Sequence, residues 1–211
     1  MKTPPSGPPM FHYEDLAIEL HPKVYDPAED SFLLLENITF DSKDSILELG
    51  TGCGLLALAC AHQGAQVVCT DINPFAVQLT RHNIERNRHL LKGDIEIRQG
   101  NLFSVLKNNE RFTVILFNPP YLPTKKIEKV GGWFDIATEG GPTGLKLTKR
   151  FLQGLHKHLQ PKGCAYFIFS SLSNRSTLEH YLKNERLSAE IIASHRYDEE
   201  NLDVYRVTPT D

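Results

Sequence analysis

Residues 45–64 constrain the fold more than any other part of the chain. They begin with the run SILEL, continue through a glycine loop from Gly50 to Gly54, and end in the helical pattern LLALACAHQG. A short run dominated by apolar residues is typical of a strand buried on both faces, as in parallel sheets covered by helices. Strand, glycine loop and helix together form the first half of a nucleotide-binding βαβ unit. Taken alone, the glycine run also fits a plain tight turn, so its context matters.

The next strand ends in a carboxylate. Gln66 to Asp71 reads as this strand, and Asp71 follows the glycine loop at the distance where such folds place the acid that binds ribose hydroxyls. Asn73 and Pro74 then supply the N-cap and the first position of a helix over Pro74 to Asn87. Helix-start chemistry is the competing interpretation of Asp71. Because Asn73 already fills the cap role, Asp71 is left for a ligand.

A third strand is expected to add residues to the ligand site at the carboxyl ends of the strands. Ile95 to Gln99 reads as this strand, and Gly100, Asn101 and Leu102 follow it. Ligands of open α/β sheets lie outside the carboxyl ends of the strands. The side-chain amide of Asn101 can donate or accept at an adenine edge.

The fourth strand leads into a polar corner. Residues 113–123 read TVILFNPPYLP, so a buried strand ends at Asn118, Pro119, Pro120 and Tyr121. Two prolines supply no N–H donors and fix φ, which makes the corner rigid and leaves its carbonyls free to accept. Asn118 adds an amide oxygen and Tyr121 an aromatic face. The corner fits a planar group that carries an NH2, although a strand ending in an ordinary turn is the competing interpretation.

Such a corner suits methylation of an amide or aryl amine. The lone pair of such a nitrogen is delocalised, so the nitrogen is a poor nucleophile. Two acceptors that hold its two hydrogens aim the lone pair and favour positive charge on nitrogen during attack. A strong general base is then not required.

The other expected elements continue the alternation of strands and helices. Asp26 is placed to cap a helix over Pro27 to Asn37, with Glu29 closing a capping box. A loop of about 20 residues after Asn118 contains Trp133, and its length suggests a function. Four elements follow: a helix to about Leu159, a strand over Ala165 to Ser170, a helix over Ser173 to Asn184, and an antiparallel hairpin of Ala189 to Arg196 with Asp203 to Val207.

Composition narrows the class of protein. Charged residues make up 23% of the chain and the net charge is -3, so no global basic field favours nucleic acid. Four cysteines without C-x-x-C spacing and nine histidines without metal-ligand spacing predict no disulfides and no metal site. No apolar run reaches the roughly 18 residues of a membrane span, and we expect a cytoplasmic protein. Residues 1–20 are expected to be a flexible tail and residues 21–211 a single domain.

Three motifs together carry a family resemblance. GTGCG after a strand, Asp71 after the next and FNPPY after the fourth resemble the class I S-adenosylmethionine-dependent methyltransferases of the HemK/PrmC type. YDPAEDSFLLL and CTDINP are most similar to the archaeal and eukaryotic glutamine methyltransferases of translation termination factors. The similarity covers roughly residues 21–160. It implies an α/β, Rossmann-like, seven-stranded and mostly parallel sheet of order 3-2-1-4-5-7-6 with helices on both faces.

The resemblance also implies a cofactor and its site. S-adenosylmethionine, which leaves as S-adenosylhomocysteine, is expected over the glycine loop, with Asp71 on the ribose and no metal. Asn101 stands where relatives often have an aspartate, which weakens its expected adenine contact. The residues expected to bind the cofactor are Tyr25, Glu29, Ser31, Glu48, Gly50, Thr51, Gly52, Gly54, Asp71, Ile72, Asn101, Leu102 and Asn118.

The implied reaction is methylation of a glutamine side-chain amide, in the Gly-Gly-Gln motif of a peptide chain release factor. Asn118, Pro119 and Tyr121 are the expected catalytic residues, and with Pro120 they form the expected substrate site. Two alternatives within the enzyme class stay open. One is methylation of the exocyclic amine of adenine, which a lysine cluster (Lys125, Lys126, Lys129) would favour and the net charge disfavours. The other is lysine methylation, for which no base is apparent.

Two further classes fit less well. A dinucleotide oxidoreductase would need the last glycine of the G-x-G-x-x-G fingerprint, which the G-x-G-x-G run of residues 50–54 lacks. A non-catalytic cofactor-binding protein would leave the NPPY corner without a role.

A partner is expected at one edge of the sheet. In the implied order, Ile95 to Gln99 is an edge strand that Glu96 and Arg98 protect only weakly, although charged edges are common. Archaeal and eukaryotic members of the family pair with a small zinc-binding activator protein that adds a strand at this edge. Bacterial members instead carry an N-terminal helical domain, which we do not expect here because only about 24 residues precede Tyr25. The partner would then help to present the release factor.

Overall fold

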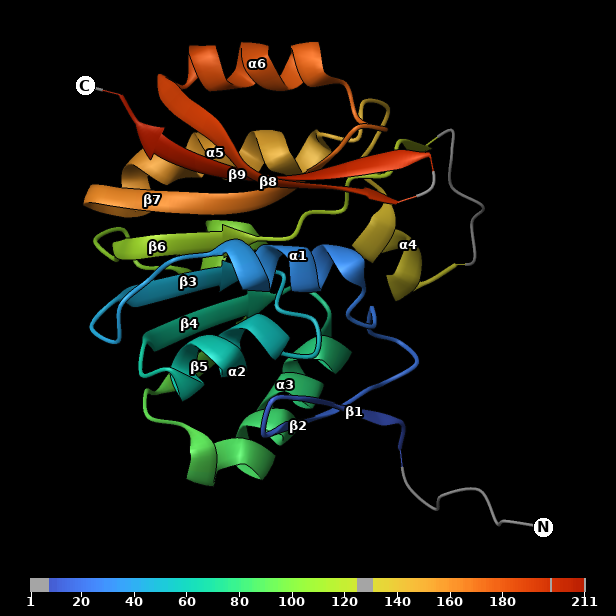
Figure 1. Ribbon diagram of the computed structural model, residues 1–211, viewed down its shortest axis with the longest axis vertical. Coiled ribbons are helices and arrows are strands. Elements are labelled where there is room, and N and C mark those ends of the chain that lie inside the picture. Colours follow the sequence, from blue (N-terminus) through green and yellow to red (C-terminus); the bar gives the residue numbers. More distant parts are fainter. Residues whose placement is uncertain (1–7, 125–130, 198, 211) are drawn as a thin grey trace.

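The computed structural model describes residues 8–124, 131–197 and 199–210. Within these residues a seven-stranded sheet has the order β5-β4-β3-β6-β7-β9-β8 (Figure 1). β5 through β7 run parallel, whereas β9 is antiparallel to both β7 and β8. If these seven strands are numbered 1 to 7 in chain order, from β3 to β9, their order in the sheet is the predicted 3-2-1-4-5-7-6. The predicted fold class is therefore confirmed. The strands are β3 (Ser45–Leu49), β4 (Gln66–Asp71), β5 (Ile95–Gln99), β6 (Phe112–Phe117), β7 (Leu159–Ser170), β8 (Leu187–Tyr197) and β9 (Glu200–Pro209).

Helices cover both faces of the sheet, as the alternation of β6 shows. Val114 and Leu116 belong to the core under α1 (Glu29–Asn37), α2 (Leu55–His62) and α3 (Pro74–Asn87). Ile115 and Phe117 belong to the opposite core under α5 (Lys146–His158) and α6 (Arg175–Asn184). Successive side chains of a strand point to opposite faces, so a wholly apolar strand such as β6 requires cover on both sides. Short 3-10 turns, η1 (Arg88–Leu90) and η2 (Leu102–Val105), follow α3 and β5.

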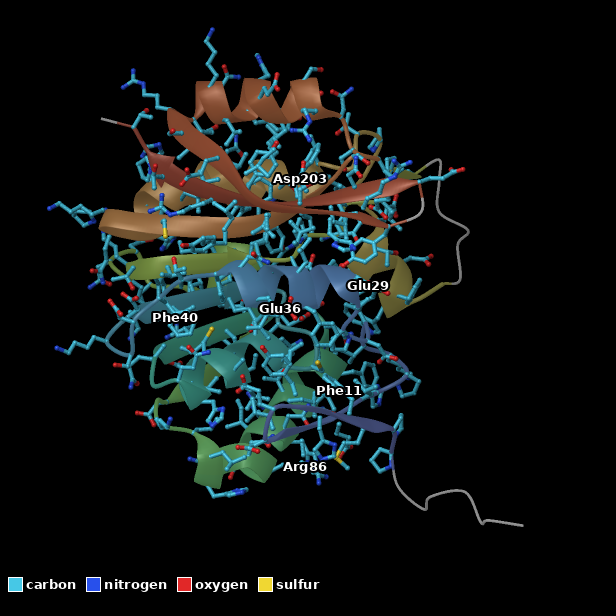
Figure 2. All side chains as sticks on the ribbon, in the orientation of Figure 1. Phe11, Glu29, Glu36, Phe40, Arg86 and Asp203 are labelled. Carbon is cyan, nitrogen blue, oxygen red and sulfur yellow. The ribbon has the colours of Figure 1, made fainter. Side chains whose placement is uncertain are left out.

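The segment expected to be a flexible tail contains a hairpin. β1 (Met10–Tyr13) and β2 (Leu16–Glu19) pair as an antiparallel two-stranded sheet, and Leu16 and Ile18 are fully buried. Asn83 and Asn87 of α3 bond to the backbone of β2, and Arg86 pairs with Glu19 at 3.0 Å. Figure 2 labels Arg86 on α3 and Phe11 on the hairpin. The tail prediction is therefore wrong for the hairpin residues, because two buried apolar side chains and two asparagines fix them on the domain. Residues 1–7 lie outside the described part, and one domain over residues 21–211 stays a prediction.

The first long helix starts later than expected. Its N-cap is Ala28 and makes no side-chain cap bond, so Asp26 does not cap it as predicted. Residues 25–28 instead precede the helix, with Ala28 extended, and a Cβ on Gly52 would lie 3.9 Å from the Tyr25 carbonyl. This late start places Asp30 inside the first turn. By contrast, α3 begins as predicted, with the Asn73 side chain accepting from the Phe75 N–H at 2.9 Å.

The C-terminal half differs from expectation mainly in length. The long loop after β6 contains a helix, α4 (Trp133–Thr138), and β7 starts six residues before the predicted strand. The last two strands form the predicted antiparallel hairpin, with a bulge near Ile191.

Two negative findings concern only the described residues. None of their helices is long and apolar enough to cross a membrane. No group of three or more of their His, Cys, Asp or Glu side chains is arranged to hold a metal ion.

Candidate active site

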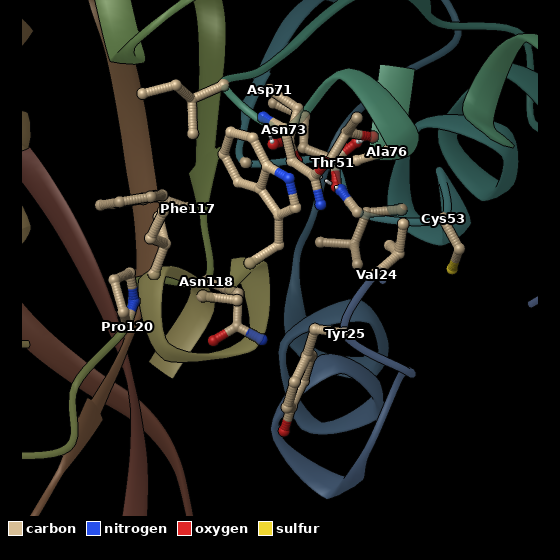
Figure 3. Close-up of a pocket in the computed structure, with 18 of the residues that line it drawn as sticks. Val24, Tyr25, Thr51, Cys53, Asp71, Asn73, Ala76, Phe117, Asn118 and Pro120 are labelled. Carbon is tan, nitrogen blue, oxygen red and sulfur yellow. Dashed lines mark hydrogen bonds between the residues drawn. The ribbon is translucent and has the colours of Figure 1, made fainter. Parts of the chain in front are cut away.

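The carboxyl ends of β3, β4, β5 and β6 open onto one pocket (Figure 3). Parallel strands bring their carboxyl ends to one edge of the sheet, where the chain turns away into helices and leaves space for a ligand. Of the residues predicted to bind the cofactor, eleven line this pocket: Tyr25, Ser31, Glu48, Gly50, Thr51, Gly52, Asp71, Ile72, Asn101, Leu102 and Asn118.

Two predicted residues, Gly54 and Glu29, are not among the lining residues. Gly54 has φ of 87° and precedes α2, and a Cβ there would lie 2.9 Å from Thr80 Cγ2. A glycine at position 54 is therefore needed for the close packing of α2 against α3. Glu29 is the first residue of α1, and its position at the helix start suits the helix dipole.

The carboxylate of Asp71 joins the glycine loop to the end of β4. Its Oδ2 accepts from the Gly52 N–H at 2.9 Å and its Oδ1 from the Asn73 N–H at 2.8 Å. Burial raises the pKa of Asp71 above its ordinary value even though these N–H donors oppose the shift. A carboxylate has about four lone-pair sites, so it keeps acceptor capacity for a hydroxyl donor in the pocket.

Glu48 lies at the end of β3 beneath the glycine loop. One of its oxygens accepts from Thr51 Oγ1 at 2.6 Å and from the Ala57 N–H at 3.1 Å. Burial is the main reason that the pKa of Glu48 rises to about 8, with the nearby Asp71 adding to the rise. This side chain therefore fixes the shape of the loop and sits protonated near neutral pH.

Asn101 has little acceptor capacity left for a ligand. Its Oδ1 accepts from Arg150 at 3.2 Å, and its side chain also accepts from the Ser104 N–H in a capping box at the start of η2. Both partners are donors, so the oxygen faces them and the amide NH2 is the group left for a ring edge. Ile72 is 43% exposed beside it and offers an apolar surface.

A second pocket joins the first at the NPPY corner. Asn118, Pro119, Pro120 and Tyr121 all line it. Asn118 and Pro120 also line the first pocket, and Tyr25 faces Asn118 from the other side (Figure 3). The structure therefore brings the predicted substrate residues to the end of the predicted cofactor pocket.

The side-chain oxygen of Asn118 is buried without a hydrogen-bond partner. Asn118 Nδ2 donates to Ser31 Oγ at 3.4 Å, whereas Oδ1 has no partner among the described residues. A buried unsatisfied acceptor costs roughly 1–3 kcal/mol, so it marks a place where a donor from outside the chain is expected. The corner is less open elsewhere than predicted, because the carbonyls of Tyr121 and Leu122 accept from Ser173 Oγ and the Gly140 N–H.

Sequence reasoning missed Asp30. Its side chain is 4% exposed and lines the second pocket, where Oδ2 accepts from the Tyr121 hydroxyl at 3.2 Å. Burial, with Asp30 as the next cause, raises the pKa of both Tyr25 and Tyr121, so both hydroxyls keep their protons. The sequence assigned this stretch to helix capping. The signal that could have identified Asp30 is its place beside Ser31, which was already expected in the site.

Sequence reasoning also missed α4 as a wall of the site. Trp133 and Ile136 line the first pocket, Phe134 and Thr138 line the second, and Ala137 lines both. The unusual length of the loop was the only signal for this segment.

The fold and the site together define a class. A seven-stranded sheet of this order with a glycine loop after its first strand, an acid after the second and an NPPY corner after the fourth is the arrangement of a class I methyltransferase. The family model described as "Methyltransferase small domain" matches residues 23–133, and the chain belongs to this methyltransferase family.

Two relatives extend over most of the chain. A protein of Methanocaldococcus jannaschii with the provisional name protein N5-glutamine methyltransferase is 38% identical over 87% of this chain and 91% of its own. Methyltransferase HEMK2 of Homo sapiens is 29% identical over 88% of this chain and 89% of its own.

Solved structures share the fold at lower identity. The E. cuniculi Mtq2-Trm112 complex, described as responsible for methylation of the eRF1 translation termination factor, contains a chain that matches with a TM-score of 0.69. The match is 19% identical and covers 89% of this chain and 99% of that one. The T. thermophilus 16S rRNA N2 G1207 methyltransferase, solved with AdoMet and guanosine, matches with a TM-score of 0.68 at 20% identity, over 95% of this chain and 50% of that one.

Proposed function

We propose that this protein methylates the side-chain amide nitrogen of a glutamine in another protein, with S-adenosylmethionine as donor. The observation that carries the proposal is the buried, unpartnered Oδ1 of Asn118 at the junction of the two pockets. An NH2 group entering from the second pocket would satisfy this oxygen and bring its nitrogen to the end of the first pocket.

The first pocket fits the donor. Backbone at Gly50 and Gly52 allows close approach, Asp71 keeps lone pairs for ribose hydroxyls, and the amide NH2 of Asn101 can donate to a ring nitrogen of adenine. When bound, S-adenosylmethionine supplies an electrophilic methyl group on a sulfonium and leaves as S-adenosylhomocysteine. The proposal includes no metal.

The second pocket orients the acceptor. Asn118 Oδ1 and the Pro119 carbonyl would accept from the two amide hydrogens, which aims the nitrogen lone pair and favours the positive charge that develops there. Tyr121 packs beside the amide plane and is held in place by Asp30. The bound donor would give its methyl group to this nitrogen with loss of the C–S bond, and the nitrogen would release one proton to solvent, so no strong base is needed.

The acceptor we propose is the Gly-Gly-Gln motif of a release factor. Support comes from names of relatives, including the release factor glutamine methyltransferase of Gloeobacter violaceus, which is 30% identical over 72% of this chain and 56% of its own. A release factor acts in the cytoplasm, where translation terminates, so we propose that compartment for this protein. All four cysteines are free and buried, which agrees with a reducing compartment.

We also propose a small zinc-binding partner protein at β5. Within the described sheet β5 pairs only with β4, so its outer backbone groups are available for an added strand. Ile95 and Ile97 are partly buried apolar residues of this edge strand. The fold match to the Mtq2 chain of a complex with Trm112 adds support.

A labelled methyl donor tests the acceptor class. The protein is incubated with a Gly-Gly-Gln peptide, a lysine peptide or adenine-containing DNA, with the partner present or absent. We expect label only in the glutamine peptide, since none of the described residues that line the second pocket is basic. The predicted lysine cluster (Lys125, Lys126, Lys129) lies outside the described residues. Label in DNA or in lysine alone would overturn the proposal.

A further inference from the structure

α4 forms a wall shared by the two pockets. Trp133 lines the first pocket, Phe134 the second, and Ala137 the junction. Neighbouring residues of a helix point about 100° apart, so Trp133 and Phe134 can face different cavities from one turn. Any shift of this short helix therefore changes both pockets together.

Two of the contacts described for α4 join it to residues that line the second pocket. Its C-terminal end is tied to the NPPY corner by a bridge between Leu122 and Glu139, with the Leu122 N–H donating to the Thr138 carbonyl at 3.2 Å. Near its N-terminal end, the ring of Phe134 packs against the ring of Tyr25, with 6.5 Å between the two ring centroids. Gly131 and Gly132 precede the helix with φ of 92° and 74°, a conformation that glycine adopts without strain.

The apolar side chains of α4 are poorly covered. Phe134 is 46% exposed and Ile136 is 49% exposed, although each lines a pocket. Large apolar side chains that stay exposed beside a cavity gain stability when a ligand covers them, by roughly 25 cal/mol per Å² of buried surface. A ligand in either pocket therefore has apolar surface of α4 to bury.

We propose that Trp133 is a positioning residue that couples the two pockets. The inference rests on the proposed function. Cofactor bound in the first pocket packs against Trp133 and fixes α4, and the fixed helix holds Phe134 and the Leu122 bridge in the geometry that receives the acceptor. Binding couplings are reciprocal, so a bound acceptor strengthens cofactor binding by the same factor.

Trp133 is the single tryptophan of the sequence, so intrinsic fluorescence reports on it directly. S-adenosylhomocysteine is titrated into the full chain, with calorimetry for affinity and acrylamide quenching for access to Trp133. We expect quenching to fall by about two-fold or more at saturation. Binding in the calorimeter with unchanged quenching would overturn the inference, whereas no binding at all would overturn the proposed function itself.

A second experiment measures the coupling. The dissociation constant of a Gly-Gly-Gln peptide is measured with and without saturating S-adenosylhomocysteine, in the complex with the partner. We expect a ratio of about 5 or more in the wild type, within the usual range of such couplings, and a ratio near 1 in Trp133→Ala and in Phe134→Ala. Ile192→Ala is the matched control, since Ile192 is another exposed apolar residue but lies on β8. An undiminished ratio in Trp133→Ala contradicts the inference.

Discussion

At the residue scale, the hydrogen-bond acceptors of the site differ in whether donors of this chain already occupy them. Asp71 and Asn101 each use part of their capacity to hold the loops around them. Asn118 Oδ1 differs, because it is buried at the junction of the pockets and has no partner among the described residues. In the proposed function, this difference separates the residues that shape the cofactor pocket from Asn118, which would receive the acceptor.

Replacing Asn118 separates the two roles. Asn118→Ala removes one preorganised acceptor, so we expect kcat to fall by about 10² to 10³. The affinity for S-adenosylhomocysteine should change little, because Asn118 is one of many residues that line the first pocket. Steady-state kinetics and calorimetry measure the two quantities. Thr148→Ala is the control, since Thr148 Oγ1 is also a buried atom without a partner in the described structure but lies on α5 outside both sets of lining residues. Loss of cofactor binding in Asn118→Ala would contradict the assignment.

Glu48 predicts a dependence of stability on pH. Its pKa of about 8 in the folded protein lies above the ordinary 4.5, so between these values the folded state holds a proton that the unfolded state has lost. The free energy of unfolding then falls as pH rises through this window, by at most about 1.4 kcal/mol per unit. Glu48→Gln keeps an oxygen acceptor for Thr51 and the Ala57 N–H but cannot ionise.

We therefore expect the variant to gain stability relative to wild type from about pH 5 to pH 8. Urea unfolding without cofactor at pH 5, 6.5 and 8 measures the difference. Parallel profiles for the two proteins would show that Glu48 ionises normally.

At the element scale the β1–β2 hairpin depends on α3. Asn83 is fully buried, and its amide accepts from the Glu19 N–H and donates to the carbonyls of Glu19 and Cys53. Asn83→Ala leaves these backbone groups without partners, so we expect a loss of about 2–3 kcal/mol in the free energy of unfolding. Arg86→Ala is the matched control on the same helix, because its ion pair with Glu19 is partly exposed and worth at most about 1 kcal/mol. Urea unfolding that ranks the two variants equally would contradict this account.

The register of β5 predicts which of its N–H groups face a partner. The Val67 N–H donates to the Asp94 carbonyl and the Gly100 N–H to the Asp71 carbonyl, which in a parallel ladder turns the Ile97 N–H away from β4. Ile97→Pro thus removes an outward donor and leaves the β4–β5 ladder intact. We expect this variant to stay folded and to lose partner binding in a pull-down.

Ile97→Ala serves as the control, since it shortens the side chain and keeps the N–H. A complex that survives Ile97→Pro would contradict strand addition at this edge.

At the scale of the whole molecule, local patterns were enough to predict the sheet but not the walls of the site. The glycine loop, Asp71 and the NPPY corner were found because each follows a buried apolar strand, and parallel topology brings such strand ends together. The β1–β2 hairpin was missed because its burial depends on asparagines over 60 residues away. Asp30 was missed because α1 begins at Glu29 without the side-chain cap that the sequence suggested, which places Asp30 in its buried first turn.

The most direct test is the position of the transferred methyl group. The protein, with its partner, is incubated with isotope-labelled S-adenosylmethionine and a Gly-Gly-Gln peptide, beside a Gly-Gly-Glu peptide of the same length, and the products are fragmented by mass spectrometry. We predict one labelled methyl on the glutamine side-chain amide, none on the glutamate peptide, and loss of the signal in Asn118→Ala. A methyl on a backbone, lysine or terminal nitrogen, or equal labelling of both peptides, would contradict the claim that Asn118 receives a glutamine amide.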